Sequence, residues 1–177
     1  YILKYDGIGQ PKFLQHIIKE GLARHLRQQK KYVVQRNAIS GYGIYANINI
    51  QAGEIIFKGE EKAQRIVTKT FVDQNWNEKE QEDFARYAYP ISKEVFILWS
   101  DNPADWAPQN HSCNANTGYT GLNVIALRNI AKGEELTLDY AQFLDENAQP
   151  FQCSCGSSNC RGLITGKKHN QIHSIIG

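Results

Sequence analysis

The spacing of apolar residues changes near residue 31. Before it, in residues 11–29, apolar side chains recur at intervals of three and four, which places them on one face of a helix. They are Phe13, Leu14, Ile17, Ile18, Leu22 and Leu26. The opposite face is basic, with Lys19 and Arg24 among its residues. We expect this to be the solvated face of a packing helix; contact with DNA phosphates on a nucleosome is the alternative.

After residue 31 the pattern changes to short β-rich runs separated by turns. The runs that we expect to be strands are residues 32–35, 44–48, 54–57, 94–99 and 123–127. Residues 40–43 are expected to form a tight turn, and residues 51–53 a hairpin turn into the next strand. Many short strands predict a compact, mainly β fold with short helices.

One such helix is marked by its termini. Asn77 followed by Glu80 resembles a capping box, and the apolar spacing continues to about Tyr89. Pro90 is expected to end the helix there. Further on, residues 133–140 predict a turn that leads into a strand ending in Tyr140.

Length and composition indicate one main domain with appendages. The chain has 177 residues, of which 41% are hydrophobic and 21% charged, as in an ordinary globular protein. It contains no apolar run of the roughly 18 residues that a membrane span needs, and no signal peptide. The net charge of +2 is small for a dedicated nucleic-acid binder. Because the chain begins with Tyr1 and lacks methionine, we expect it to be part of a longer or processed protein.

The four cysteines are unevenly placed. Cys153, Cys155 and Cys160 form a Cys-x-Cys-x4-Cys run, whereas Cys113 is isolated. A tetrahedral zinc site needs four such ligands, which would require the tail to fold back onto residue 113. Disulfides fit poorly because a Cys-x-Cys bridge is strained, and buried free thiols are the other alternative. Residues 147–177 have too little apolar content for a core of their own, so we expect zinc to hold them.

Taken one at a time, the remaining motifs are weak. The Gly-x-Gly sequence at residues 41–43 lets a backbone approach a ligand closely, but it also occurs in plain hairpins. Tyr140 alone would be a half-buried strand residue. His111, within Asn110-His111-Ser112-Cys113, is as compatible with a loop histidine as with a direct role.

Together the motifs resemble one family. They are Gly41-Tyr42-Gly43-Ile44-Tyr45-Ala46; Gly53-Glu54 with Lys58-Gly59-Glu60; Asn110-His111-Ser112-Cys113 with Asn116; Gly133-Glu134-Glu135-Leu136-Thr137 with Asp139-Tyr140; and Cys153-x-Cys155-x4-Cys160-Arg161-Gly162. Their order is that of SET-domain protein lysine methyltransferases with a post-SET zinc segment. The resemblance covers roughly residues 31–165.

The resemblance implies a SET fold, in which several small β-sheets surround a knot-like core. The segment with Asn110 would pass near or through a loop made by residues 133–140. It also implies S-adenosylmethionine as cofactor, bound by the glycine turn and by Asn110 and the backbone of His111. The residues expected to bind the cofactor are Gly41, Tyr42, Gly43, Asn110 and His111. One structural zinc ion would be bound by Cys113, Cys153, Cys155 and Cys160.

The implied reaction needs positioning more than acid–base chemistry. A lysine amine, whose unperturbed pKa is about 10.4, must lose its proton before it attacks the methyl group, and a dry channel favours the neutral amine. Tyr140 is the expected catalytic residue, which would orient the amine and the methyl group. The candidates for the channel wall, each of which ordinary core packing would explain as well, are Phe96, Trp99, Trp106, Leu138 and Phe143.

Three residues depart from the family pattern. Phe57 stands where a tyrosine is frequent, so a hydroxyl contact is absent. Ala107 stands where an arginine is common, so a cofactor contact is lost or supplied elsewhere. Leu138 stands where Phe or Tyr often tunes the number of methyl groups added. Since leucine cannot hold a water molecule in the channel, we expect more than one methyl group to be transferred.

These features predict an N-terminal helical extension at residues 1–30, a SET domain at 31–147, a post-SET zinc segment at 148–166 and a tail at 167–177. The expected activity is methylation of a lysine on a histone tail, with H3 as default, or on another protein; an inactive SET-like binding module is the alternative. We expect a soluble monomer with a histone tail or nucleosome as partner, without membrane or sequence-specific nucleic-acid binding. Nuclear action is expected, in a host cell if the chain is a bacterial effector, with which its composition is compatible.

Overall fold

The computed structural model describes residues 10–28, 30–37, 40–62, 64–99 and 107–168. Trp106, one of the expected channel residues, lies outside these ranges. The chain divides into two compact units, residues 1–31 and 32–177. No helix in the described ranges has both the length and the apolar character needed to cross a membrane.

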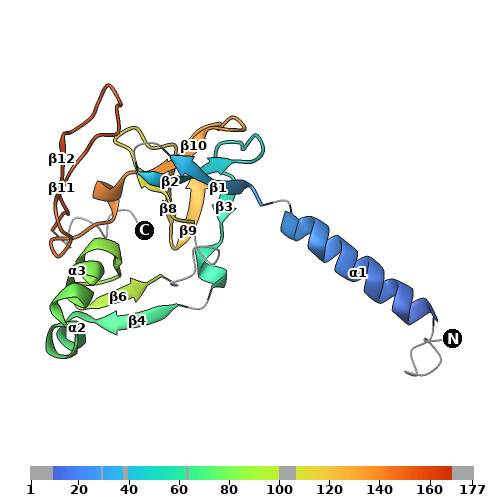
Figure 1. The fold of residues 1–177 in the computed structure, drawn as a ribbon, viewed down its shortest axis with the longest axis horizontal. Helices are drawn as coiled ribbons and strands as arrows, with labels where there is room; N and C mark the ends of the chain where they lie inside the picture. Colours follow the sequence, from blue (N-terminus) through green and yellow to red (C-terminus); the bar gives the residue numbers. More distant parts are fainter. Residues whose placement is uncertain (1–9, 29, 38–39, 63, 100–106, 169–177) are drawn as a thin grey trace. The chain divides into compact units, whose positions relative to one another are not determined.

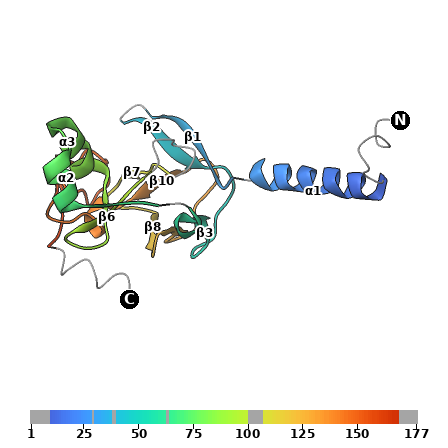
Figure 2. The same ribbon diagram turned by 90° about the horizontal axis from the view of Figure 1, so that it is seen from below.

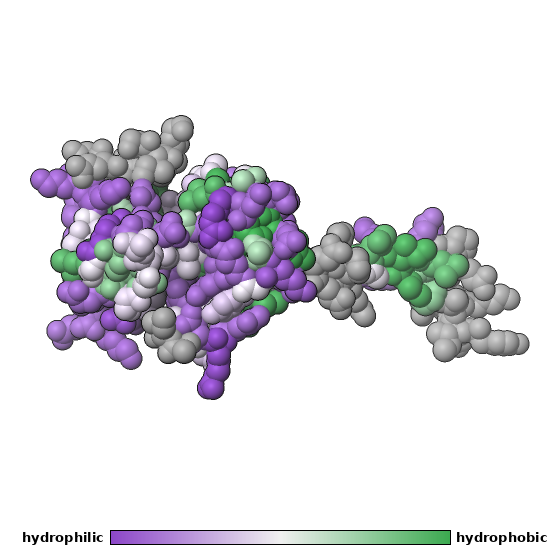
Figure 3. Space-filling view, turned by 90° about the horizontal axis from the view of Figure 1, so that it is seen from above, coloured by the Kyte–Doolittle hydropathy of each residue, from purple (hydrophilic) through white to green (hydrophobic). Residues whose placement is uncertain are grey.

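The first unit contains helix α1 (Gln10–Gln28), which confirms the helix expected at residues 11–29. Its apolar side chains include Leu14, Ile17, Ile18 and Leu22, which are exposed within this unit. They form a continuous apolar surface on the helix (Figure 3).

The second unit is built around a seven-stranded sheet (Figure 1). Six of its strands follow one another across the sheet as β1 (Tyr32–Asn37), β2 (Gly41–Ala46), β10 (Glu135–Leu138), β8 (Thr117–Thr120), β9 (Asn123–Ala126) and β3 (Ile55–Phe57). The seventh, β7 (Asn110–His111), pairs with β10. Strand order and chain order differ, so most neighbours in this sheet are distant in the sequence.

Two local predictions were wrong in this region. The tight turn expected at residues 40–43 is the start of β2, because Gly41, Tyr42 and Gly43 already pair with β1. The turn at residues 51–53 does not close a hairpin, since β3 pairs with β9 through Ile55 and Ile125. Ile44 and Ala46, two positions apart on β2, are both buried on one face of the strand, whereas Tyr42 at the same face is exposed where the strand begins.

A parallel pairing joins the two motifs that the resemblance places together. Asn110 lies opposite Thr137 and His111 lies opposite Leu138. The backbone N–H of Ser112 donates to the carbonyl of Leu138 at 3.0 Å, which extends this pairing by one residue. Figure 2 shows β2, β7 and β10 close together in the perpendicular view.

A smaller sheet and two helices form a second layer. The sheet has the order β4 (Arg65–Thr68), β6 (Val95–Leu98) and β5 (Tyr89–Pro90). Helix α2 (Lys69–Asn75) follows β4, and helix α3 (Glu78–Tyr87) carries the expected capping box between Asn77 and Glu80. The helix ends two residues earlier than expected, because Tyr89 and Pro90 pair with β6.

Each layer has its own apolar core. The larger cluster comprises Tyr32, Ile44, Ala46, Ile50, Ile56, Phe57, Ala107, Val124, Ala126, Ile130 and Leu136. The smaller cluster comprises Val72, Phe84, Ala88 and Phe96. Burying one such aliphatic or aromatic side chain stabilises a fold by roughly 1.5–3 kcal/mol, so both layers are held mainly by these side chains.

The C-terminal segment has little regular structure. It contains the short strands β11 (Phe151–Gln152) and β12 (Leu163–Ile164), which pair with each other. Two 3-10 helices, η2 (Gly59–Glu61) and η4 (Tyr140–Gln142), complete the described elements. The N–H of Gln149 donates to the carbonyl of Ala85 at 3.3 Å, which fastens this segment to the end of α3.

Candidate functional site

The four cysteines meet at one point. Their Sγ atoms all lie within 4.8 Å of one another, and those of Cys113 and Cys153 are 3.8 Å apart. A tetrahedron with Zn–S bonds of about 2.3 Å has edges of about 3.8 Å, so this donor set fits one zinc ion. The tail therefore folds back onto residue 113, as the cysteine spacing predicts.

Residues beside the cysteines dock the tail on the sheet. The side chain of Asn159 donates to the carbonyl of Cys113 at 3.1 Å, and the backbone N–H of Arg161 lies 3.3 Å from the Cys113 Sγ. The guanidinium of Arg161 also pairs with the Asp139 carboxylate. Burial disfavours the ionised form of Asp139, but hydrogen bonds from Arg161 and Gln142 outweigh it and lower the pKa of this carboxyl. Asp139, the acidic member of this ion pair, directly precedes Tyr140 in the chain.

His111 connects the cysteine cluster to Tyr140. Its side chain is 5% exposed, and its Nδ1 accepts a hydrogen bond from the backbone N–H of Tyr140 at 3.2 Å. Nε2 lies 3.4 Å from the Cys113 Sγ and is therefore the protonated nitrogen of the neutral ring. Burial lowers the pKa of His111, although Asp139 opposes this shift. This geometry favours a positioning role over that of a base.

Tyr140 is held with its hydroxyl inside the molecule. The hydroxyl donates to the backbone carbonyl of Gln109 at 2.5 Å. Burial, with a smaller contribution from Tyr87, raises the pKa of Tyr140 to about 12. The phenol is thus neutral near pH 7 and acts as a hydrogen-bond donor rather than as a base.

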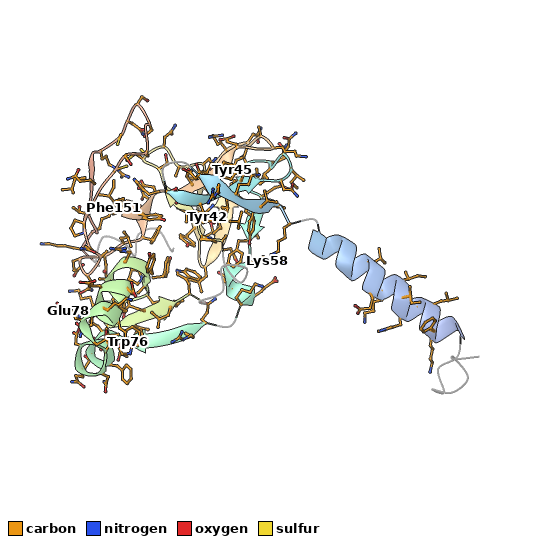
Figure 4. The ribbon with its side chains drawn as sticks, in the orientation of Figure 1. Tyr42, Tyr45, Lys58, Trp76, Glu78 and Phe151 are labelled. Carbon is orange, nitrogen blue, oxygen red and sulfur yellow. The ribbon has the colours of Figure 1, made fainter. Side chains whose placement is uncertain are left out.

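Tyr140 lines the larger of two neighbouring cavities. The larger, of about 510 Å³, is lined by Tyr140, Asn110 and Gln109, by the end of α3 and by Phe151 of the C-terminal segment. The smaller, of about 370 Å³, is lined in part by residues 113–115 and by Asp139. Four residues line both cavities, namely Tyr89, Tyr119, Leu138 and Phe143. In Figure 4 Phe151 lies on the C-terminal segment, on the side of the unit where α3 also lies.

The shared wall is largely aromatic. The ring centroids of Tyr89 and Tyr119 are 5.2 Å apart, and that of Phe143 lies 5.7 Å from Tyr89 and 5.2 Å from Tyr119. Tyr140 contacts Phe143 at 5.5 Å. Burial raises the pKa of Tyr119, and Tyr89 and Tyr140 add to this shift, so its hydroxyl is also neutral. Such a wall suits the alkyl stem of a long side chain, from which it excludes water, and a methylated ammonium group at its end.

Asn110 presents its amide in one defined orientation. Its Nδ2 donates to the carbonyl of Tyr42 and to the Glu135 carboxylate, both at 2.8 Å. Its Oδ1 has no hydrogen-bond donor among the residues that the structure describes, and the residue lines the larger cavity. Asn110 therefore has an unused hydrogen-bond acceptor, and the residue that carries it lines this cavity.

The structure places the remaining expected residues as follows. Tyr42 and Gly43 lie beside Asn110, but neither they nor Gly41 line the two cavities. Trp99 lines the larger cavity. Phe96 lines neither cavity and is 2% exposed in the smaller core, where its ring packs on Phe84.

Sequence reasoning missed four residues of the site. Tyr89 and Tyr119 line both cavities, Phe151 lines the larger one, and Glu135 orients Asn110. Glu135 lies within a recognised motif and Tyr119 lies close to one, and these positions are the signal that could have drawn attention to them. Tyr89 was assigned to a helix, so nothing in the local pattern pointed to a cavity.

The fold and the site define a class of protein, and comparison with known proteins agrees with it. A model of the SET domain matches residues 41–141, which is more than half of the chain. The chain belongs to the SET-domain family, and its four-cysteine cluster is like a post-SET zinc site. Mainly β structure in several small sheets confirms the expected fold class.

Similar proteins are histone-lysine methyltransferases by name. The chain is 33% identical over 146 residues to histone-lysine N-methyltransferase ASHH3 of Arabidopsis thaliana, covering 78% of this chain and 38% of the relative. It is 32% identical over 146 residues to histone-lysine N-methyltransferase trithorax of Drosophila virilis, covering 76% of this chain and 4% of the relative. It thus spans well under half of the length of these relatives.

The solved methyltransferase domain of human histone-lysine N-methyltransferase SETMAR has a similar fold. Its TM-score is 0.55, with 17% sequence identity, and the alignment covers 79% of this chain and 60% of that one.

Proposed function

We propose that this chain is a protein-lysine N-methyltransferase that transfers a methyl group from S-adenosylmethionine to a lysine side chain. The observation that carries the proposal is that two cavities share one aromatic wall, and that Tyr140 lines the larger cavity and packs on Phe143 of this wall. Such an arrangement lets a methyl donor and a lysine approach each other from opposite sides. A histone tail, with H3 as the default, is the proposed substrate, as the names of the relatives suggest.

The larger cavity would hold the cofactor. Its volume of about 510 Å³ lies in the usual range for small-molecule sites. The Asn110 Oδ1 acceptor matches the ammonium group of the cofactor's amino-acid end, because an ammonium has only donors. His111 keeps the backbone of Tyr140 in place, and Tyr42 and Gly43 support Asn110 from β2. When bound, S-adenosylmethionine supplies an electrophilic methyl group on a sulfonium.

The smaller cavity and the shared wall would admit the target lysine. Aromatic rings remove water from its alkyl stem and disfavour the charged amine, so the proton leaves to solvent before the reaction. The Tyr140 hydroxyl, neutral because its pKa is raised to about 12, then orients the amine through a polar contact. Alignment of amine and methyl group supplies much of the rate. The zinc ion held by the four cysteines would fix the C-terminal segment over the cofactor.

Methyl transfer to nucleosomes and to a lysine peptide array, read by mass spectrometry, tests this function. We expect Tyr140→Phe to lower the transfer rate by about 100-fold or more, because one positioned polar contact is lost. Cofactor binding measured by calorimetry should remain nearly unchanged. Tyr32→Phe is the matched control, since that side chain lies in the larger core, lines neither cavity and should leave both values unchanged. Full activity of Tyr140→Phe would refute the mechanism.

The same experiment addresses two further points. Leu138 offers no hydroxyl to the shared wall, so we propose that dimethyl or trimethyl product forms; only monomethyl product at long times would contradict this. A chain that binds no cofactor would instead be a SET-like binding module, the alternative that Ala107 favours because it brings no cation to the larger cavity. We further propose nuclear action, in a host cell if the chain is a bacterial effector.

A further inference from the structure

The lining of the larger cavity contains one charged side chain among the residues that the structure describes. It is Arg86, in the last turn of α3. Ala107, at the position where an arginine is common in the family, is buried and lines the same cavity. A cation is therefore present at this cavity, although it comes from a different element of the fold.

Arg86 is available to a ligand. It forms no ion pair with any acidic residue in the described part of the chain, and its guanidinium carbon lies 6.0 Å from the centre of the Tyr87 ring. Tyr87 lines the same cavity. A guanidinium beside an aromatic ring keeps its planar set of donors free for a carboxylate. Arg86 also lies in the last turn of α3, where a cation stabilises the helix through its dipole. A structural role of this kind alone predicts no effect of Arg86 on the choice of ligand.

The charge pattern of this cavity matches a zwitterion. Asn110 provides an acceptor for an ammonium group, and Arg86 provides donors for a carboxylate. These two groups are bonded to the same carbon in the amino-acid end of S-adenosylmethionine. We propose that Arg86 is a specificity-determining residue that binds the cofactor's carboxylate in place of an arginine at position 107. This inference rests on the proposed function.

Calorimetry with two ligands tests the assignment. One is S-adenosylhomocysteine, and the other is its analogue in which hydrogen replaces the carboxylate. We expect the wild type to prefer S-adenosylhomocysteine by about ten-fold, the size expected for one charge-assisted hydrogen-bonded contact at a partly exposed site. In Arg86→Gln this preference should fall to about two-fold or less, with the affinity for the analogue unchanged. Arg86→Lys should retain most of the preference because it keeps the charge.

The outcomes separate this assignment from the proposed function and from a structural role. Lys79→Ala, which removes a cation on the same helix but outside the cavity lining, should leave the preference intact. Equal loss of affinity for both ligands in Arg86→Gln would show a structural role and overturn the assignment, as would an unchanged preference. If the wild type binds S-adenosylhomocysteine but shows no preference, the assignment fails while the proposed function stands. If it binds neither ligand, both fail.

Discussion

Gly43 shows how the absence of one side chain shapes the site. A Cβ atom at this position would lie 2.3 Å from the Glu135 Oε1 and 3.1 Å from the Asn110 Nδ2. The glycine is thus needed for close approach of its neighbours rather than for an unusual backbone angle, since its φ is not positive. The second glycine of the Gly-x-Gly motif makes room for a carboxylate of the protein and not directly for a ligand.

Gly43→Ala should therefore weaken cofactor binding with little effect on stability. The added methyl group displaces the end of the flexible Glu135 side chain, which frees Asn110 to rotate its acceptor away from the cavity. We expect the dissociation constant for S-adenosylhomocysteine to rise about ten-fold, the effect of losing one oriented hydrogen bond to a charged group. Gly21→Ala is the control, because an added Cβ there meets nothing within 4 Å. An unchanged dissociation constant for Gly43→Ala would contradict this role of the glycine.

At the residue scale, the sequence identified motif residues better than wall residues. The four cysteines could be grouped from their spacing, and Tyr140 from its motif. Phe96 and Phe143 could not be told apart, because both are aromatic residues near motifs and only the fold places one in a core and the other between two cavities. An aromatic residue in a sequence indicates a buried side chain. Whether that side chain packs in a core or lines a cavity depends on partners that are far away in the sequence.

At the scale of elements, the four-cysteine cluster fastens a segment that has almost no core of its own. Among the described residues 148–168, one apolar residue has a fully buried side chain, and that residue is Ile164. The cysteine cluster joins this segment to Cys113, and the Gln149–Ala85 hydrogen bond joins it to α3.

Removing the metal should release this segment selectively. We expect a chelator to increase amide hydrogen exchange in β11 and β12, to leave β10 protected and to stop methyl transfer, since Pro150 and Phe151 line the larger cavity. Cys113→Ser should impair transfer in the same way. Metal analysis should give one zinc per chain, and a value near zero would rule out the zinc site. Unchanged kinetics of Cys113→Ser would show that the metal and cofactor sites are independent.

The Arg161–Asp139 pair is the second link between tail and sheet. Asp139 also accepts a hydrogen bond from the N–H of Ala141 at 3.2 Å, so it shapes the 3-10 turn that begins with Tyr140. We expect Arg161→Ala and Asp139→Asn each to lower the transfer rate several-fold, and asparagine is chosen because it keeps an acceptor for Ala141.

A double-mutant cycle measures this link. The two single changes should not add, with a coupling of about 0.5–2 kcal/mol, which is the usual range for residues in direct contact. The control is Lys58→Ala, which removes an exposed ion pair with Glu61 and should leave transfer unchanged. Strict additivity of the two changes would show that the pair does not act as a unit.

At the scale of the whole molecule, the sequence predicted element types but not their partners. The helix at residues 10–28 and the capping box at Asn77 follow from local spacing and were found. The pairing of β3 with β9 was not foreseen, because it joins residues about 70 positions apart and no local pattern encodes such a choice. The meeting of β7 with β10 was expected only through resemblance to the SET family.

Buried tyrosines should make the fold sensitive to alkali. Burial raises the pKa values of Tyr32, Tyr89, Tyr119 and Tyr140. Above about pH 10 the unfolded chain releases tyrosine protons that the folded chain retains, so the free energy of unfolding decreases as the pH rises. The decrease should reach about 1.4 kcal/mol per pH unit for each such tyrosine, and this contribution is fully present below about pH 10.

Urea unfolding at several pH values in a zinc buffer checks this behaviour. For Tyr140 the loss should extend from about pH 10 to about pH 12, the value to which its pKa is raised. Tyr140→Phe should accordingly give a shallower decrease than the wild type over that interval. Equal slopes for the two proteins would mean that Tyr140 is not buried as described.

The parallel pairing of β7 with β10 also bears on how the protein folds. Asn110 and Glu135 are 25 positions apart, and the chain between them contains β8 and β9, which form a local antiparallel pair and can close early. Asn110 and Tyr140 come together only when β10 has joined both β8 and β7, a step that requires closure of a longer loop. A chain arrested before this step has most of its β-structure but no active centre. Under the proposed function, methyl transfer would therefore report completion of the native topology, which measurements of secondary structure alone do not.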